Sequence, residues 1–155
     1  MNINYHSTKN SPYGITSGGV VFDDRQKVLL LFKIEGGSKT YHLPKGTLEE
    51  DESLEACAKR EIMEESGAEV EIICYLGGLQ ANFMFSGYNL NKINHYYGAK
   101  LKSAQLADMD SEHQGREWVN IDDASELLKL NDNPKQEWII VERLKAWLEL
   151  NSHND

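Results

Sequence analysis

Apolar residues in the first hundred positions gather in short runs that polar segments separate, a pattern typical of β-strands. Residues 15–22 and 27–33 form two such runs, and the four polar residues between them predict a hairpin. Residues 35–40, which include two adjacent glycines, are predicted to form a loop. Two further strands are predicted at 69–79 and 92–101, with the residues between them as a connection.

The last third of the chain combines one short strand with two helices. Residues 118–121 are the predicted strand, and Asp122 or Asp123 is the predicted N-cap of the next helix. A second helix is predicted over 133–150, with Pro134 near its first turn, where a missing N–H costs nothing. Its apolar residues recur at helical spacing and are assigned to packing: Trp138, Ile139, Val141, Leu144, Trp147 and Leu148. Strands interleaved with helices predict an α/β protein with a mixed sheet.

Length and charge narrow the class of protein. The 155 residues fit one domain, spanning 1–155, with a single core. The net charge of −9 disfavours a nucleic-acid binder but permits a phosphorylated substrate that placed cations neutralise. The N-terminus lacks the apolar core of a signal peptide, and the longest apolar run, 28–32, is too short to cross a bilayer. We therefore expect a cytoplasmic protein, with Cys57 and Cys74 as buried thiols.

Acidic residues concentrate between Leu43 and Gly67. Within this segment, residues 53–66 are predicted to form a helix, with Asp51 or Ser53 as its N-cap. Gly67 is the predicted left-handed stop at the C-terminal end. On a helical wheel, the apolar residues within about 60° of Glu61 form the buried face: Leu54, Cys57 and Ala58.

The same face of this helix carries three carboxylates, because Glu64 and Glu65 lie within about 60° of Glu61, one turn further on. Anions beside a core repel one another and lose hydration, and only Lys45 and Lys59 are lysines of this segment. A Glu-Glu pair alone is typical of solvated surface. The full spacing instead predicts a divalent metal that supplies the missing charge, and carboxylate ligands favour Mg²⁺, with Mn²⁺ as a substitute.

The spacing of glycine and charged residues resembles the Nudix box, Gly-x5-Glu-x7-Arg-Glu-aliphatic-x-Glu-Glu-x-Gly-aliphatic. A chance match in a chain of this length is on the order of one in ten million. Ala68 departs from the pattern, because it is small where a bulkier aliphatic residue is usual. The resemblance implies the Nudix fold, a mixed β-sheet sandwiched between helices (α/β/α). Every charged and glycine position of the box is filled: Gly46, Glu52, Arg60, Glu61, Glu64, Glu65 and Gly67.

This resemblance implies metal-dependent hydrolysis of a nucleoside diphosphate that is linked to some further group. Glu52 is implied to assist from the loop, and Arg60 is implied to orient a glutamate through paired hydrogen bonds. The implied metal ligands are the carbonyl oxygen of Gly46 and the carboxylates of Glu61, Glu64 and Glu65.

Two further stretches resemble asymmetrical diadenosine tetraphosphate hydrolases, and a third, around Lys45, is a weaker indication because other Nudix hydrolases can also have a basic residue there. The segment 111–119 resembles a loop whose glutamate faces the metal, which makes Glu112 an implied metal ligand or base. Lys92 is implied to meet a phosphate, and Tyr96 to hydrogen-bond a phosphate or stack on adenine. Lys45, directly before Gly46, is a further implied phosphate contact.

Each of these substrate residues also has a plainer interpretation. Lys45 fits a solvated loop lysine, and Tyr96 fits a tyrosine packed on a sheet. His113 fits a surface or hydrogen-bonding histidine as well as a phosphate contact. Trp118 fits the core.

The sequence therefore predicts Mg²⁺-dependent cleavage of diadenosine tetraphosphate to ATP and AMP, with a small nucleotide polyphosphate as partner and no membrane. Pyrophosphohydrolysis of modified nucleoside triphosphates, or of 5′-triphosphorylated RNA, is an alternative, and the net charge of −9 disfavours RNA. A Nudix-fold sensor that binds a nucleotide without cutting it is an alternative of another class. The presence of every box glutamate disfavours that sensor.

Overall fold

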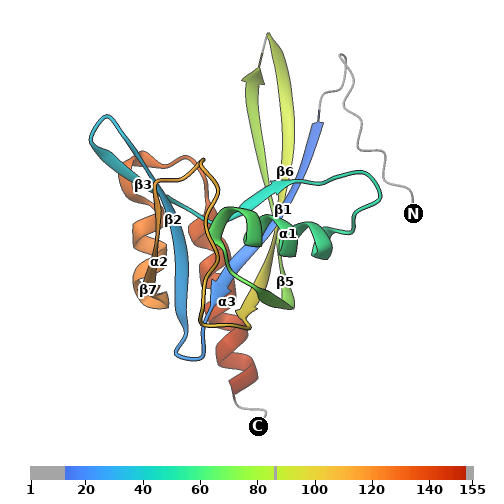
Figure 1. Cartoon of the computed structure of the whole chain (residues 1–155). Coiled ribbons are helices and arrows are strands. Elements are labelled where there is room, and N and C mark those ends of the chain that lie inside the picture. The colour runs from blue at the N-terminus through green and yellow to red at the C-terminus, as the bar shows by residue number, and fades with distance from the viewer. Residues whose placement is uncertain (1–12, 86, 153–155) are drawn as a thin grey trace.

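The computed structural model of the protein describes residues 13–85 and 87–152 (Figure 1). The strands are β1 (Tyr13–Phe22), β2 (Lys27–Glu35), β3 (Ser38–His42), β4 (Lys45–Thr47), β5 (Val70–Phe85), β6 (Tyr88–Leu101) and β7 (Gly115–Asn120). The helices are α1 (Leu54–Ser66), α2 (Ile121–Leu128) and α3 (Glu137–Ser152), with a 3₁₀ turn, η1 (Leu130–Asp132).

The strands form one mixed sheet with the order β3-β2-β1-β6-β5. The pairing of β1 with β6 is parallel, and the other pairings are antiparallel. Residues 16–18 of β1 pair with β4, whereas Val21 and Phe22 pair with β2. Because β1 has these two partners on one edge, it ties β4 to the rest of the sheet, and β7 extends the sheet by pairing with β2.

Alternating side chains on β1 and β2 divide the core into two layers. Val20 and Leu30 face α2 and α3 and join the buried residues of those helices. Val21 and Leu29 point to the opposite face, where Ile62 of α1 packs. The sheet is therefore sandwiched between helices, which confirms the predicted α/β/α fold (Figure 1).

The first predicted hairpin is confirmed, but the predicted glycine-rich loop over 35–40 is wrong. β1 and β2 pair antiparallel, as expected. After β2, only Gly36 and Gly37 form a turn, with φ of 57° and 82°, and Glu35 pairs directly with Ser38. Two adjacent positive φ values match the twist of a tight hairpin, so β3 begins inside the segment predicted to be a loop.

β5 and β6 form a hairpin that is much longer than predicted and projects from the body of the molecule (Figure 1). Most of the segment predicted to be a connection, residues 80–91, lies inside these strands. Gln80 and Asn82 are exposed there, and Ile93 is 44% exposed. Residues 79–83 alternate apolar and polar side chains, so the pattern of a strand continues past the predicted boundary.

The boundary between β7 and α2 also differs from the prediction. β7 begins at Gly115, and Ile121, predicted to end the strand, is the first residue of α2. Asn120 is the N-cap, while Asp122 and Asp123 lie in the first turn. Carboxylates in a first turn are stabilised by the helix macrodipole, which accounts for their position without a capping role.

The last helix begins later than predicted. α3 starts at Glu137, three residues after Pro134. The Asn133 side chain donates a hydrogen bond to the Tyr41 carbonyl oxygen at 3.0 Å and accepts one from the Lys135 backbone N–H at 3.1 Å, which holds this segment outside the helix. Apolar packing of α3 is confirmed for Val141 and Leu144, which are fully buried, and for Trp138 and Leu148, which pack against them. Ile140, which was not predicted, is also fully buried, whereas Ile139 and Trp147 are only partly buried.

Several expectations concern the chain as a whole. Cys57 is buried and Cys74 is half-buried, and both are free thiols. None of the helices within residues 13–85 and 87–152 is long and apolar enough to cross a membrane. The cytoplasmic location and the assignment of 1–155 to one domain stay predictions.

Candidate active site

Helix α1 carries most of the predicted site, and both of its ends are fixed as predicted. Ser53 is the N-cap, and its Oγ accepts a hydrogen bond from the Ala56 backbone N–H at 3.0 Å. Gly67 ends the helix with φ of 76°, and a Cβ at this position would lie 2.0 Å from the Ala107 carbonyl oxygen. A glycine is therefore required both by the backbone conformation and by the close approach of the loop.

Burial changes steeply along the carboxylate face of α1. Ile62 is fully buried, and Glu65 is 6% exposed. The Glu61 side chain is 14% exposed and that of Glu64 is 54% exposed. Cys57, predicted for this buried face, is buried. The three glutamates thus share one face, with Glu65 deepest and Glu64 nearest to solvent.

Strand β4 passes directly against this face. The Lys45 backbone N–H donates a hydrogen bond to Glu65 Oε1 at 2.7 Å. A Cβ added at Gly46 would lie 2.0 Å from Glu61 Oε2, so only glycine allows the Glu61 carboxylate to come this close to the strand. Gly46 and Glu61 are therefore neighbours, as a shared ligand set requires, although their role as ligands stays a prediction.

A pocket of about 580 Å³ opens beside α1 and β4. Glu49 lines its rim, and we call the other carboxylates of its lining the acidic group: Glu61, Glu64, Glu65, Asp110 and Glu112. We call its lysines and one histidine the basic group: Lys33, His42, Lys45, Lys92 and Lys135. Of the predicted site residues, the pocket is lined by Lys45, Gly46, Arg60, Glu61, Glu64, Glu65, Lys92 and Glu112. Glu52 and Tyr96 do not line it.

Arg60 lies at the centre of a network of carboxylates. Its Nε and Nη2 donate hydrogen bonds to the two oxygens of Glu52 at 2.7 and 2.9 Å. Its Nη1 donates to Glu61 Oε1 at 2.7 Å and lies 3.4 Å from Glu64 Oε2. The paired hydrogen bonds expected of Arg60 are thus made with Glu52, which supports Arg60 from behind the pocket; the part that either residue plays in a reaction stays a prediction.

Burial and neighbouring charge shift these carboxylates in opposite directions. Burial raises the pKa of Glu65 to about 7, and the nearby charge of Asp110 adds to the shift. Burial also raises the pKa of Glu61, against the opposing effect of Arg60. Hydrogen bonds from Arg60 lower the pKa of Glu52 to about 2. The effect of Arg60 therefore dominates at Glu52, whereas burial dominates at Glu61 and Glu65.

The basic group contains both predicted phosphate contacts, Lys45 and Lys92, and a lysine that was not predicted, Lys135. Burial lowers the pKa of Lys92, and the charge of Lys45 lowers it further. His42 Nδ1 lies 3.3 Å from the Lys135 amine. Burial, followed by the charge of Lys135, lowers the pKa of His42 to about 3, which keeps this imidazole neutral.

Tyr96 lies beneath the basic group and does not line the pocket, and its predicted contact with a phosphate or adenine stays a prediction. Its side chain is 1% exposed, and its hydroxyl donates a hydrogen bond to Glu137 Oε2 at 2.7 Å. Glu137 is fully buried, accepts a hydrogen bond from the Leu43 backbone N–H at 3.1 Å, and lies 3.9 Å from the Lys45 amine. Tyr96 and Glu137 therefore form a buried support for Lys45. No local signal in the sequence marks Glu137, because its partners are far away in the chain.

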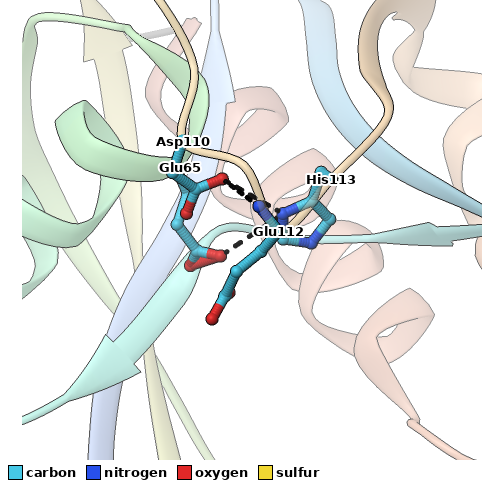
Figure 2. Close-up of side chains that lie close together, drawn as sticks. All are labelled: Glu65, Asp110, Glu112 and His113. Atoms are coloured by element: carbon cyan, nitrogen blue, oxygen red, sulfur yellow. Dashed lines mark hydrogen bonds and ion pairs between the residues drawn. The ribbon is translucent and has the colours of Figure 1, made fainter.

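The loop before β7 meets the deep end of α1 and brings four possible ligands together (Figure 2). They are Glu65, Asp110, Glu112 and His113, whose ligand atoms lie within 4.8 Å of one another. Glu65 and Glu112 are predicted site residues, whereas Asp110 is not marked by any motif. His113 is not a surface histidine, since its side chain is 6% exposed; burial lowers its pKa.

The segments that form this site fall within the span of one known protein family. A sequence profile of the NUDIX domain matches residues 12–141, a span that includes β4, α1 and the loop before β7. The chain belongs to the Nudix family.

Two Nudix relatives show how far the similarity extends in sequence. A Mycobacterium tuberculosis protein that carries the name mutator protein MutT4 is 31% identical over 113 residues, which are 68% of this chain and 46% of that protein. The chain thus spans less than half the length of this relative. The asymmetrical bis(5′-nucleosyl)-tetraphosphatase of Sus scrofa is 27% identical over 104 residues, which are 66% of this chain and 71% of the relative.

Solved structures of Nudix proteins share the fold at low identity. A NUDIX hydrolase from Nitrosomonas europaea superposes with a TM-score of 0.67 and 22% identity, covering 88% of this chain and 90% of the other. An Ap4A hydrolase of C. elegans also gives a TM-score of 0.67, at 21% identity, covering 88% of this chain and 98% of the other. At identities this low, the similarity supports the fold alone.

Nudix hydrolases generally use divalent metals, and the residues of this pocket fit such an ion. Glu61 and Glu65 are carboxylates whose pKa values are raised by burial, which a bound cation would offset. The Nδ1 atom of His113, beside Glu65, is buried and lacks a hydrogen-bond partner within the described part of the chain. A cation would stabilise the charged carboxylates and give Nδ1 a partner. The Nudix-box oxygens are ligands of the kind that Mg²⁺ and Mn²⁺ prefer. The identity of the ion stays a prediction.

Proposed function

We propose that this Nudix protein hydrolyses a phosphoanhydride bond in a nucleoside diphosphate derivative, with Mg²⁺ or, as a substitute, Mn²⁺. The substrate that we propose is diadenosine tetraphosphate, with ATP and AMP as products. The observation that carries the proposal is the division of one pocket into an acidic and a basic group of side chains. A polyphosphate with a bound cation presents charges of both signs, and such a pocket is complementary to it.

The acidic group and the backbone of β4 would hold the cation. The candidate ligands are the Gly46 carbonyl oxygen, Glu61, Glu64, Glu65 and Glu112. When bound, a divalent ion neutralises phosphate charge and makes hydroxide available at neutral pH. Arg60 fixes the Glu61 carboxylate through a 2.7 Å hydrogen bond, so this ligand is oriented before substrate arrives.

The basic group would bind the phosphate chain. Lys45 is held from below by Glu137, and Lys92 and Lys135 lie in the same pocket. Ammonium groups stabilise the negative charge that the phosphate oxygens carry in the transition state. Partial burial makes these charges more effective than lysines in open solvent. Because Tyr96 is buried, no residue is assigned to the adenine base.

Similarity in sequence supports the choice of diadenosine tetraphosphate. The pig relative is named an asymmetrical bis(5′-nucleosyl)-tetraphosphatase. The stretch around Glu112 and the Lys92 strand resemble the same subfamily. A cytoplasmic location, where nucleotides are abundant, forms part of the proposal.

The test is incubation of the purified protein with diadenosine tetraphosphate and Mg²⁺ in ¹⁸O-labelled water, with products identified by mass. We expect ATP and AMP, and the labelled product identifies the phosphorus that water attacks. A Glu61→Gln variant is the negative control, and Glu55→Gln, an exposed position of the same helix, is the matched control. If the wild-type protein hydrolyses another nucleotide but leaves the dinucleotide intact, diadenosine tetraphosphate is not the substrate.

A second candidate is pyrophosphohydrolysis of modified nucleoside triphosphates. The observation that favours it is the 31% identity to the M. tuberculosis protein, which is named a mutator protein. A panel of nucleoside triphosphates and 5′-triphosphorylated RNA, run beside the dinucleotide, separates the candidates by kcat/KM. Binding of nucleotides without turnover of any of them would indicate a sensor.

A further inference from the structure

His113 has an unusual position for a histidine. Its side chain is 6% exposed, and Nδ1 is a buried polar atom without a hydrogen-bond partner among the residues that the structure describes. Buried polar atoms are almost always hydrogen-bonded, so a partner of another kind is indicated. Nδ1 points toward Glu65 and Asp110, as Figure 2 shows.

The distances around Nδ1 are slightly longer than those between ligands of one bound ion. Nδ1 lies 3.6 Å from Glu65 Oε2 and 3.8 Å from Asp110 Oδ1, too far for a hydrogen bond in either case. Ligand bonds of about 2.1 Å separate neighbouring ligands by about 3.0 Å in an octahedral site and about 3.4 Å in a tetrahedral one. A small contraction around an ion therefore completes the observed arrangement, and Glu112 adds a further carboxylate within 4.8 Å.

The loop that carries these residues is fixed at both ends. The Asp110 backbone N–H donates to the Glu64 carbonyl oxygen at 3.0 Å, which ties the loop to the end of α1. The Gln114 backbone N–H donates to the Phe32 carbonyl oxygen at 3.0 Å, which ties it to β2. The Asp110 carboxylate is oriented in turn, since its Oδ1 accepts a hydrogen bond from the Glu112 backbone N–H at 3.2 Å. The ligand atoms are thus preorganised by the backbone.

We propose that Glu65, Asp110, Glu112 and His113 form a cation subsite with one imidazole ligand, which selects a first-row transition-metal ion over Mg²⁺. Mg²⁺ prefers an all-oxygen shell, whereas Mn²⁺, Fe²⁺ and Zn²⁺ accept imidazole nitrogen beside carboxylate oxygen. The subsite shares Glu65 and Glu112 with the proposed Mg²⁺-binding set, so it deepens the proposed function. It rests on that function only through these two residues.

Mn²⁺ is the probe that tests the subsite, because its pulsed electron paramagnetic resonance signal reports directly bound ¹⁴N. The wild-type chain is loaded with less than one equivalent of Mn²⁺ in excess Mg²⁺, which occupies the all-oxygen positions. We expect modulation from one coordinated imidazole nitrogen. In His113→Gln this modulation disappears and the Mn²⁺ dissociation constant rises at least about tenfold, while the Mg²⁺ dissociation constant changes little.

His42→Gln is the matched control, because its ring centroid lies 6.0 Å from that of His113 and it is the other histidine of the pocket. This variant is expected to retain the nitrogen signal. If His113→Gln fails to fold, Asp110→Asn serves instead, with the nitrogen signal retained and Mn²⁺ affinity reduced. Bound Mn²⁺ without nitrogen modulation in the wild type, a signal that survives in His113→Gln, or equal affinity for Mn²⁺ and Mg²⁺ overturns the subsite.

The same preparation is assayed with diadenosine tetraphosphate and Mg²⁺ alone, which separates the two proposals. Turnover without a nitrogen signal leaves the proposed function standing and removes the subsite. A nitrogen signal without turnover of any nucleotide leaves the subsite standing and removes the function.

Discussion

The glutamates of the acidic group project mainly from successive turns of one helix, whereas the lysines of the basic group come from β2, β4, β6 and the segment before α3. Arg60 compensates part of the acidic group, and the buried Glu137 compensates Lys45. Burial raises the pKa of Glu65 to about 7 and lowers that of His42 to about 3, and neighbouring charges of the same sign, Asp110 and Lys135, add to these shifts. The difference shows that each group disfavours further charge of its own sign, and that a ligand carrying both signs relieves both groups.

The largest effect is expected in the acidic group. Glu61→Gln removes the charge of a predicted ligand while retaining its size, and we expect kcat for diadenosine tetraphosphate to fall about 10³-fold. The free energy of unfolding, measured without metal, should fall little or rise, because burial already disfavours this charge. A variant with wild-type kcat would show that the Glu61 carboxylate is not needed for the chemical step.

In the basic group, Glu137→Gln removes the buried counter-charge of Lys45. We expect the free energy of unfolding to fall by about 3 kcal/mol, because breaking a buried charge pair leaves one charge uncompensated. KM for the dinucleotide should rise more than kcat falls. Urea unfolding and steady-state kinetics measure these effects, with Glu149→Gln on the exposed side of α3 as control. Unchanged stability would mean that Lys45 does not depend on Glu137.

The basic group also predicts a pH dependence through His42. Its folded-state pKa of about 3 lies below the ordinary value of 6.5, so the unfolded chain binds the proton first as pH falls. The contribution of this site to stability is complete above pH 6.5 and decreases toward pH 3, by at most about 2 kcal/mol between pH 7 and 5. The check is metal-free urea unfolding of wild type and His42→Gln at both pH values; the variant should show the smaller decrease. Identical decreases would contradict a neutral His42.

The smallest effect is expected for Tyr96→Phe, which tests whether Tyr96 supports Glu137 or contacts the substrate. Removing the hydroxyl leaves Glu137 with one hydrogen bond fewer, and we expect the free energy of unfolding to fall by about 1.5 kcal/mol. KM should change less than it does in Lys45→Ala. If KM rises as strongly as in Lys45→Ala while stability is unchanged, Tyr96 contacts the substrate.

Site residues whose contacts are close in sequence could be predicted, whereas those whose contacts are distant in sequence could not. The caps at Ser53 and Gly67 and the carboxylate face of α1 depend on neighbours within one or two turns, and these predictions are confirmed. Glu137 acts on Leu43, 94 residues away, so no local pattern could reveal it. Asp110 belongs to the site only because its loop is tied to the end of α1.

The errors in the fold have a related cause. Tyr96 sits in a strand whose two faces are both covered at that point, and alternation along β6 cannot reveal what covers each face. The strands of the β5–β6 hairpin continue past their predicted ends through exposed residues such as Gln80, Asn82 and Ile93, so burial does not mark where they end.

Glu137 is the first residue of α3, and it lies beneath Lys45 of β4. A chain that is synthesised from its N-terminus completes the whole Nudix box long before it can make this contact. Lys45 therefore gains its buried counter-charge only when α3 packs on the sheet. A nascent chain would in this way hold a complete set of acidic ligands before it could position Lys45 for a nucleotide.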